Sequence, residues 1–229
     1  MTDDRDGLDS LDSLAVPSFE VRHELAGWEL LWARIQPQAG DDASIGRLRQ
    51  EAVRLVRDRF DAGSLAVHPV IAELRRLFRI AGTDPTRYRP SSEALLRRLL
   101  KGDDLPAISP LVDLNNCLSA RLAVPCCVMD EQAIAAPFVL RSGAPGEEYA
   151  SLRGPFRLEG RPLLADAHGP CDAPITGSQR VKVTPETATA WLVAYLPAAA
   201  IRSERAADEL GALLGATRAL RCDTIAATR

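Results

Sequence analysis

The sequence predicts an α+β fold, with helices mostly in the first half of the chain and strands mostly in the second. Apolar residues recur at helical spacing in several segments before residue 125. After that point, short apolar runs alternate with turns rich in glycine and proline, a pattern typical of strands. Helices and strands do not alternate regularly, so we expect a mixed sheet and not a parallel βαβ arrangement.

The size and charge of the chain indicate one compact domain with an appendage. Its 229 residues, 46% of them hydrophobic, suffice for one substantial core. We predict a disordered acidic tail over residues 1–15, which are rich in aspartate, and a single domain over residues 16–229 that ends in a helix. The formal net charge of −3 does not by itself indicate a nucleic-acid partner.

Several classes of protein lack support in this sequence. No apolar run approaches the roughly 20 residues that span a bilayer, and the N-terminus is acidic where a signal peptide would be basic. We therefore expect a cytoplasmic protein with no membrane partner. Five cysteines without CxxC spacing predict buried free thiols. There is no Walker loop, G-x-G-x-x-G or G-x-S-x-G motif, and we expect no cofactor.

The first half of the chain is expected to begin with strands and continue with helices. The two strands are predicted at residues 18–21 and 28–35. Three amphipathic helices follow, at residues 45–60, 68–80 and 91–100. The third has the clearest limits, because it begins with serines that can cap a helix and Gly102 follows it.

The stretch from Pro106 to Asp130 joins a helix to a short buried strand. Leucines recur at helical spacing after Ser109-Pro110, an N-cap followed by proline at the first helical position. The helical pattern stops at Pro125, and residues 126–129 are predicted to form a strand.

Two adjacent asparagines, Asn115 and Asn116, lie inside this predicted helix. Asparagine is a poor residue for a helix interior because its amide competes for backbone hydrogen bonds. We interpret the pair as one wall of a ligand pocket. The alternative is that the amides are buried and tie the helix to the sheet.

The second half is expected to contain short strands and a closing helix. The strands are predicted at residues 138–141, 156–158, 163–165, 181–183 and 190–196. Residues 204–220 carry apolar side chains along one face, which predicts the closing helix.

A strongly basic region lies between Arg47 and Lys101. It holds 13 basic residues against 6 acidic ones, a local excess of +7. Arginines at helical spacing suit phosphate binding, although a solvated helix face would show the same pattern.

Two polar segments of the second half have alternative interpretations. His168, Cys171 and Asp172 resemble a thiol or metal constellation, but zinc requires four well-spaced ligands and a cysteine nucleophile requires a base beside it. We expect a turn at Gly169-Pro170 and no metal. Residues 176–180 form a polar loop that either presents backbone N–H groups to a ligand or merely connects two elements.

Several of these segments together resemble the B3/B4 domain in the β subunit of bacterial phenylalanyl-tRNA synthetase. SPLVDLNNCLSARLAVPCCVMD is similar to that domain's PLVDxTNYxxxxxGQPxHxFD stretch. LRSGAPGEEYASLRG and LLADAHGPCDAPITGSQRV are similar to its later segments, in the same order. The resemblance covers roughly residues 19–196 and is closer still to freestanding B3/B4 proteins. It implies a B3/B4-like mixed sheet flanked by helices.

The resemblance also implies a function, because in the synthetase this domain edits mischarged tRNA. It implies a trans-editing aminoacyl-tRNA deacylase, which hydrolyses the ester of a tRNA carrying a non-cognate or non-protein amino acid. Analogues of phenylalanine, tyrosine or arginine, such as canavanine, are candidates. The alternatives are a non-catalytic tRNA- or RNA-binding module of the same fold, and an ester or amide hydrolase using Cys127 or Cys171. Mischarged tRNA is the expected partner, while association with a synthetase and the oligomeric state are left open.

Site residues follow from the resemblance position by position. The implied catalytic residues are Asn115, Asn116 and Ser178. The implied substrate-binding residues are Cys127, Gly169, Gly177 and Gln179. We expect RNA contacts from Arg87, Arg89, Arg97, Arg98 and Lys101. Cys127 and Gln179 stand where the family has histidine and the glutamate that recognises the tyrosine hydroxyl, which disfavours tyrosine as the substrate.

Overall fold

Two sheets and a group of helices make up the computed structural model of this protein, which describes residues 17–39 and 42–229. The element order confirms the predicted α+β class. The acidic tail predicted for residues 1–15 lies outside the described residues. Within them, no helix has the length and apolar character needed to cross a membrane.

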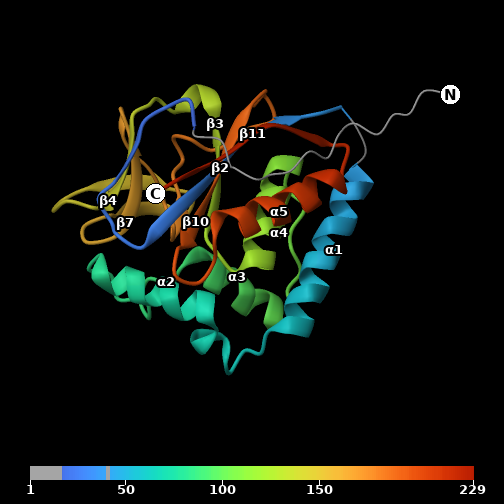
Figure 1. The fold of residues 1–229 in the computed structure, drawn as a ribbon, viewed down its shortest axis with the longest axis horizontal. Coiled ribbons are helices and arrows are strands. Elements are labelled where there is room, and N and C mark those ends of the chain that lie inside the picture. The colour runs from blue at the N-terminus through green and yellow to red at the C-terminus, as the bar shows by residue number, and fades with distance from the viewer. Residues whose placement is uncertain (1–16, 40–41) are drawn as a thin grey trace.

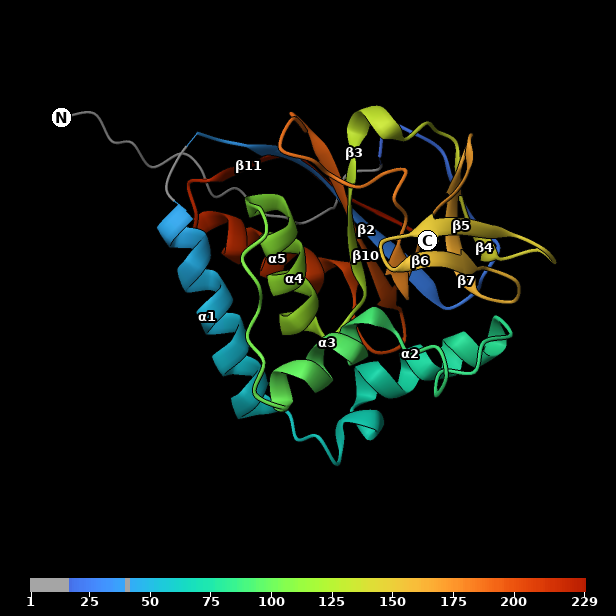
Figure 2. The same cartoon turned by 180° about the vertical axis from the view of Figure 1, so that it is seen from behind.

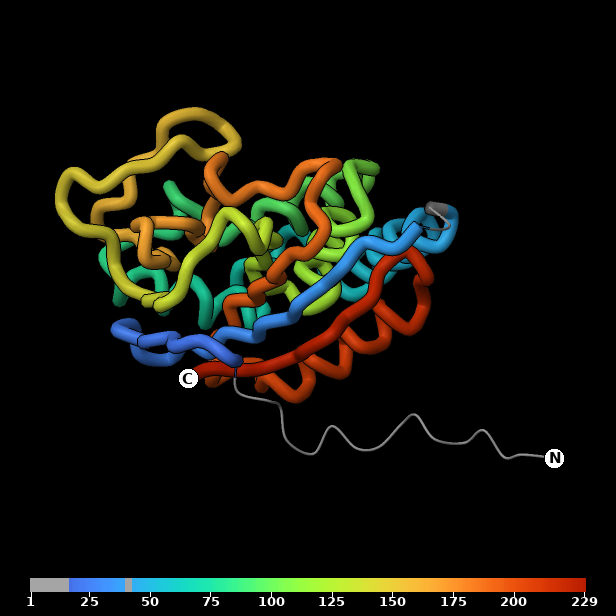
Figure 3. The backbone as a smooth tube through the Cα atoms, turned by 90° about the horizontal axis from the view of Figure 1, so that it is seen from above, coloured from blue at the N-terminus to red at the C-terminus, as the bar shows by residue number. Residues whose placement is uncertain are grey.

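The first sheet, called sheet A, is antiparallel throughout and has the order β11-β2-β10-β3. Its strands are β2 (Trp28–Pro37), β3 (Cys126–Asp130), β10 (Ala190–Pro197) and β11 (Leu220–Thr228). Its two inner strands, β2 and β10, are almost entirely buried, as expected for dense apolar runs. Figure 3 shows β2 and β11 running side by side.

The second sheet, called sheet B, is mixed and has the order β1-β4-β7-β8-β9. Its strands are β1 (Val21–His23), β4 (Phe138–Ser142), β7 (Pro162–Asp166), β8 (Gly169–Ala173) and β9 (Thr176–Gly177). Only β1 and β4 pair in parallel. A separate hairpin joins β5 (Glu148–Ser151) to β6 (Gly154–Arg157).

The helices gather mainly on the side of the molecule opposite sheet B (Figures 1 and 2). They are α1 (Asp42–Arg59), α2 (Pro69–Ile80), α3 (Ser91–Leu100), α4 (Pro110–Leu122) and α5 (Ser203–Gly215), with short 3₁₀ turns at Leu65–Val67 and Glu131–Ala133. Helix α4 contacts α1, α3 and α5 on one side and sheet A on the other. This central position fixes the face that α4 turns toward β3.

Helix α4 forms as its sequence predicts. The Ser109 hydroxyl accepts a hydrogen bond from the Val112 N–H, and Pro110 occupies the first turn. The helix ends at Ala123, whose φ of 61° is left-handed, and Pro125 then prevents its continuation.

An aromatic cluster joins the two sheets. The ring of Phe19 lies 5.0 Å from Trp32 of sheet A and 5.0 Å from Phe138 of sheet B, measured between centroids. It lies 4.9 Å from Trp191 of sheet A. Such edge-on and tilted contacts add to the burial energy of large rings, so this cluster holds sheet B against sheet A.

Several predicted elements are wrong in position or kind. The helix predicted over residues 204–220 ends at Gly215, and the missed strand β11 pairs with β2, so the domain does not close with a helix. Residues 181–183 form only an isolated bridge between Lys182 and Met129. The strand predicted at residues 18–21 shares only Val21 with the observed first strand, Val21–His23. The turn expected at Gly169-Pro170 is instead the start of β8.

Candidate functional site

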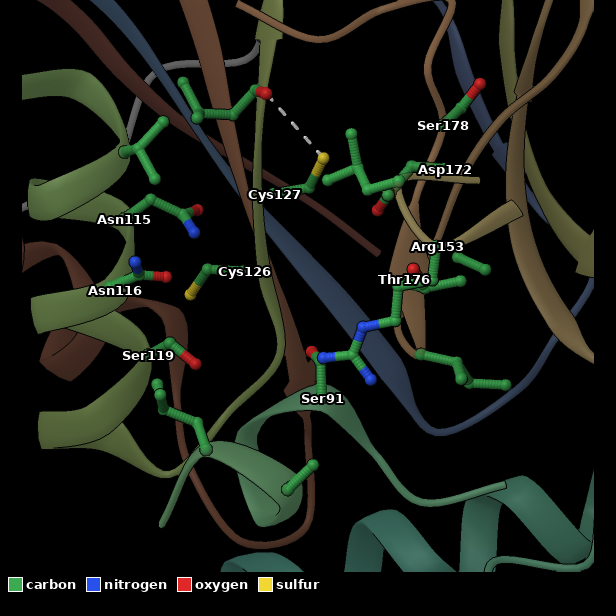
Figure 4. A pocket seen from close by; sticks show the side chains of 18 of the residues that line it. Ser91, Asn115, Asn116, Ser119, Cys126, Cys127, Arg153, Asp172, Thr176 and Ser178 are labelled. Atoms are coloured by element: carbon green, nitrogen blue, oxygen red, sulfur yellow. Dashed lines mark hydrogen bonds between the residues drawn. The ribbon is translucent and has the colours of Figure 1, made fainter. Parts of the chain in front are cut away.

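A pocket of about 640 Å³ lies where helices α3 and α4 face strand β3 and the last strands of sheet B. Its lining comes from residues 87–98, the inner face of α4, β3, the tip of the β5–β6 hairpin and residues 172–183. In Figure 4, α4 forms one wall, β3 runs behind, and Asp172 and Thr176 face α4 from the opposite side. The volume falls within the roughly 300–1,000 Å³ typical of small-molecule sites.

Polar side chains of α4 form the first wall. Asn115, Asn116 and Ser119 all line the pocket. Asn115 is only 8% exposed, and its Oδ1 atom has no hydrogen-bond partner. Ser119 donates a hydrogen bond of 2.7 Å to the Val124 carbonyl, which ties this wall to the end of the helix. The structure therefore brings both asparagines to one cavity.

Cysteines of β3 form the back of the pocket. Cys126 lies opposite Asn116, and the Cys127 thiol is directed at the Val128 carbonyl at 3.9 Å (Figure 4). Burial, together with the nearby Asp172 carboxyl, raises the pKa of Cys127 well above its ordinary value. A thiolate nucleophile is therefore disfavoured at neutral pH.

Cys171, the other cysteine considered as a nucleophile, lies in the hydrophobic core. Its thiol donates to the Leu164 carbonyl at 3.3 Å, and burial raises its pKa well above the ordinary range. Neither thiol has the environment of a reactive cysteine, so the structure disfavours the cysteine hydrolase hypothesis.

Asp172 forms the floor of the pocket opposite α4. Asp172 is only 1% exposed, and its Oδ2 atom accepts a 2.6 Å hydrogen bond from the Tyr195 hydroxyl. Its Oδ1 atom has no partner of ordinary geometry. Burial raises the pKa of Asp172 to about 7, against the lowering effect of Tyr195 and of the weak Cys127 donor. The result is a buried carboxyl that titrates near neutral pH.

Basic side chains surround the mouth of the pocket. Among the described residues that line it, Asp172 is the only acid, against five exposed bases, here called the basic rim: Arg87, Arg89, Arg98, Arg153 and Lys182. Arg153 reaches from the hairpin tip into the pocket, toward Ser91 (Figure 4). The site thus combines a positively charged entrance with an acidic floor.

Some residues implied by the resemblance lie elsewhere. Gly177 and Ser178 line the pocket, but the Ser178 hydroxyl is turned away from its centre and accepts from the Arg180 N–H at 3.2 Å (Figure 4). Gln179, which is exposed, lies outside the lining, and so do Gly169, Arg97 and Lys101. Arg97 is instead held by Glu93 at 3.0 Å.

The three residues of the supposed metal constellation point in different directions. Along β8, Cys171 packs into the core while Asp172 faces the pocket, and His168 is exposed in the turn before the strand. Among residues 17–39 and 42–229, no cluster of three or more His, Cys, Asp or Glu side chains is placed to hold a metal ion.

Sequence reasoning missed the place of Asp172 in the pocket. A usable signal was present, because the segments 162–166 and 169–173, which form paired strands, are separated by only two residues, as in a hairpin. Successive side chains of a strand point to opposite faces, so Cys171 and Asp172 are expected on opposite faces of the second strand. Tyr195, which holds Asp172, is buried in β10 and carried no signal of its own.

Comparisons with known proteins identify one family. The family model described as "B3/4 domain" matches residues 73–220. A crystal structure of an N-terminal fragment of the phenylalanyl-tRNA synthetase beta-subunit from Pyrococcus horikoshii is similar to this chain at 14% identity and a TM-score of 0.47. That similarity covers 95% of this chain and 56% of the other, so the chain spans little more than half of that fragment. A comparison with curated proteins found no match.

Proposed function

The chain belongs to the B3/4 domain family, and from this premise we propose that it is an aminoacyl-tRNA deacylase acting in trans. It would hydrolyse the ester that links a wrong amino acid to the 3′-terminal ribose of a tRNA. The observation that carries the proposal is the pocket itself, in which a basic rim surrounds a cavity walled by Asn115 and Asn116.

The basic rim supports binding of the tRNA end. Phosphate contacts supply affinity and orientation without reading sequence. Two large apolar side chains at the mouth, Ile108 and Leu152, are also exposed, and they offer a surface for the terminal base. The 3′ end would therefore rest at the entrance, with the aminoacyl group directed inward.

The α4 wall supports hydrolysis without a nucleophilic side chain. An aminoacyl ester is already activated, so a positioned water and donors for the developing oxyanion suffice. The water oxygen bonds to the carbonyl carbon, and the bond from that carbon to the ribose oxygen breaks. The ribose oxygen takes up a proton that the attacking water gives up. We assign the orienting amides to Asn115 and Asn116, and give no catalytic part to the Ser178 hydroxyl.

The proposal is tested with a panel of tRNAs, each charged with a different amino acid. We expect the protein to release at least one amino acid well above the spontaneous rate, measured as loss of acid-precipitable aminoacyl-tRNA. Binding of tRNA without release of any amino acid would instead favour the non-catalytic RNA-binding module. If the protein neither binds tRNA nor releases an amino acid, both the deacylase and the RNA-binding module are contradicted.

Asn116→Ala is expected to lower hydrolysis by about 10²-fold, the usual effect of removing one oxyanion donor. Binding of tRNA should change little, because the basic rim is intact. Single-turnover rates and filter binding measure the two effects separately. Arg98→Ala is the reciprocal variant, since it should weaken binding and leave the saturated rate nearly unchanged. Equal loss of binding and rate in Asn116→Ala would contradict its place beside the ester.

A further inference from the structure

We propose that Arg180 is a positioning residue, which holds one wall of the pocket in the place relative to Asn115 and Asn116 that hydrolysis requires. This inference rests on the proposed function, because it names a side chain that keeps the deacylase site in shape. Arg180 does not itself line the pocket. It acts through the segment that carries it, residues 176–183, here called the wall loop.

The wall loop forms the side of the pocket that faces helix α4. Thr176 and Ser178 lie across the cavity from the two asparagines (Figure 4). All residues of the wall loop except Gln179 and Arg180 line the cavity. The wall loop begins in sheet B, where β9 pairs with β8, and reaches sheet A through a bridge to β3. It therefore connects the two sheets beside the pocket.

The backbone of the wall loop bonds mainly to the β5–β6 hairpin. The Leu152 N–H donates to the Gly177 carbonyl at 3.0 Å, and the Gln179 N–H donates to the Ala150 carbonyl at 2.8 Å. A further bond, of 2.9 Å, runs from the last residue of β3 to the Val181 carbonyl. Because the hairpin belongs to neither sheet, its bonds do not fix the wall loop relative to the sheets.

The Arg180 side chain attaches the middle of the wall loop to both sheets. Its Nη1 and Nη2 atoms donate to the two carboxylate oxygens of Asp166, at 3.1 and 2.8 Å. Nη1 also donates to the Ala133 carbonyl at 2.9 Å. Nη2 donates to the Gly169 and Pro170 carbonyls at 3.3 and 3.4 Å. One side chain thus ties the wall loop to the end of β7, the start of β8 and the turn after β3.

Asp166 is a fixed anchor for this guanidinium. Its side chain is fully buried at the end of β7. Its carboxylate also accepts from the Ala135 N–H at 3.1 Å and from the His168 N–H at 2.9 Å, which hold it in one orientation. A bidentate pair fixes direction as well as distance. Lysine keeps the charge, but its single ammonium group on a flexible stem does not reproduce the fork.

Loss of the fork is expected to lower the rate of hydrolysis more than the affinity for tRNA. The wall loop faces the asparagines that orient the ester, and a misplacement of about 1 Å can cost about 10²-fold in rate. Four of the five bases of the basic rim lie outside the wall loop, so most phosphate contacts are kept.

Arg180→Lys tests this expectation. With the aminoacyl-tRNA that the wild type hydrolyses fastest in the panel, the saturated single-turnover rate should fall at least 10-fold. The Kd for tRNA should stay close to that of the wild type, because the charge is retained. A merely structural role would not separate these two quantities. Urea denaturation shows that the variant is folded at the assay temperature.

Arg34→Lys is the matched control. Arg34 forms the same kind of bidentate pair with Glu131, at 2.7 and 2.8 Å. Its side chain is 31% exposed, against 34% for Arg180, and neither member of the control pair lines the pocket. The control should keep both the rate and the affinity of the wild type.

Hydrogen exchange measures the attachment of the wall loop without any substrate. The Leu152, Gln179 and Asp130 N–H groups take part in the backbone bonds of the wall loop, and in Arg180→Lys they should exchange at least 10-fold faster. The Tyr195 N–H, which donates to the Pro125 carbonyl in the core, should exchange as in the wild type.

The outcomes separate this inference from the proposed function. If the wild type releases an amino acid and Arg180→Lys releases it at the same rate, the role of Arg180 is overturned and the deacylase stands. An equal loss of rate in Arg34→Lys would overturn that role too. If the wild type releases no amino acid from any tRNA of the panel, the proposed function fails. Hydrogen exchange then decides whether Arg180 holds the wall loop, and unchanged exchange would overturn it.

Discussion

Glu93→Ala is expected to lower the free energy of unfolding by about 3–5 kcal/mol, the usual cost of removing one partner from a buried ion pair. Glu93 is fully buried in the first turn of α3. Its carboxylate accepts hydrogen bonds of 3.0 Å from Arg75 and from Arg97. Without it, the Arg75 guanidinium, whose side chain is only 15% exposed, would lose its main counter-charge. Urea denaturation measures the change.

Glu73→Ala is the matched control for this effect. Glu73 also pairs with an arginine, Arg76, at 2.6 Å, but that arginine side chain is 54% exposed. An exposed pair contributes about 0–1 kcal/mol, so the control should lose far less stability than Glu93→Ala. Equal losses in the two variants would show that burial of the pair is not what matters.

The second large effect concerns the pH dependence of stability. The pKa of Asp172 is about 7 in the folded protein and close to the ordinary carboxyl value when unfolded. Between these values the folded state holds a proton that the unfolded state releases, so stability falls as the pH rises through 7. We expect this group to remove about 2–3 kcal/mol between about pH 5 and pH 8.

The measurement is the difference in unfolding free energy between wild type and Asp172→Asn across this pH range. Contributions from other titrating groups cancel in the difference, because they are common to both proteins. The variant should gain relative to the wild type as the pH rises. Parallel curves for the two proteins would mean that Asp172 has the same pKa in the folded and the unfolded state. That result would contradict the claim that burial raises its pKa.

Local signals explain which elements could be predicted from the sequence. Helix α3 has the predicted bounds, Ser91–Leu100, although its N-cap is Pro90 and no serine side chain caps it. Its end is a local signal, because Gly102 follows the C-cap Lys101 with a left-handed φ of 108°. Strand β11 was missed because it is defined by its pairing with β2, far away in the sequence. Val181 and Val183 have the composition of a strand but find only one bridge, at Lys182.

The same distinction applies to the site. Asn115 and Asn116 were noticed because they contradict helix propensity, which is a local property. Asp172 could be placed only through the register of β8 against β7, and its unusual pKa depends on burial by several elements. Gln179 follows the pocket-lining Ser178 by one residue, yet it is exposed because the chain turns there. Position in a motif did not determine the direction of the side chain.

The position of β2 inside sheet A bears on how the chain folds. This strand lies between β10 and β11, and Trp32 donates a hydrogen bond to Thr228, 196 residues later. Contacts of such high contact order form late, because the entropy of closing a long loop must be overcome first. Until β10 and β11 are in place, the apolar side chains of β2 lack both neighbours. Sheet A is therefore the part of this protein most exposed to misassembly and aggregation during folding.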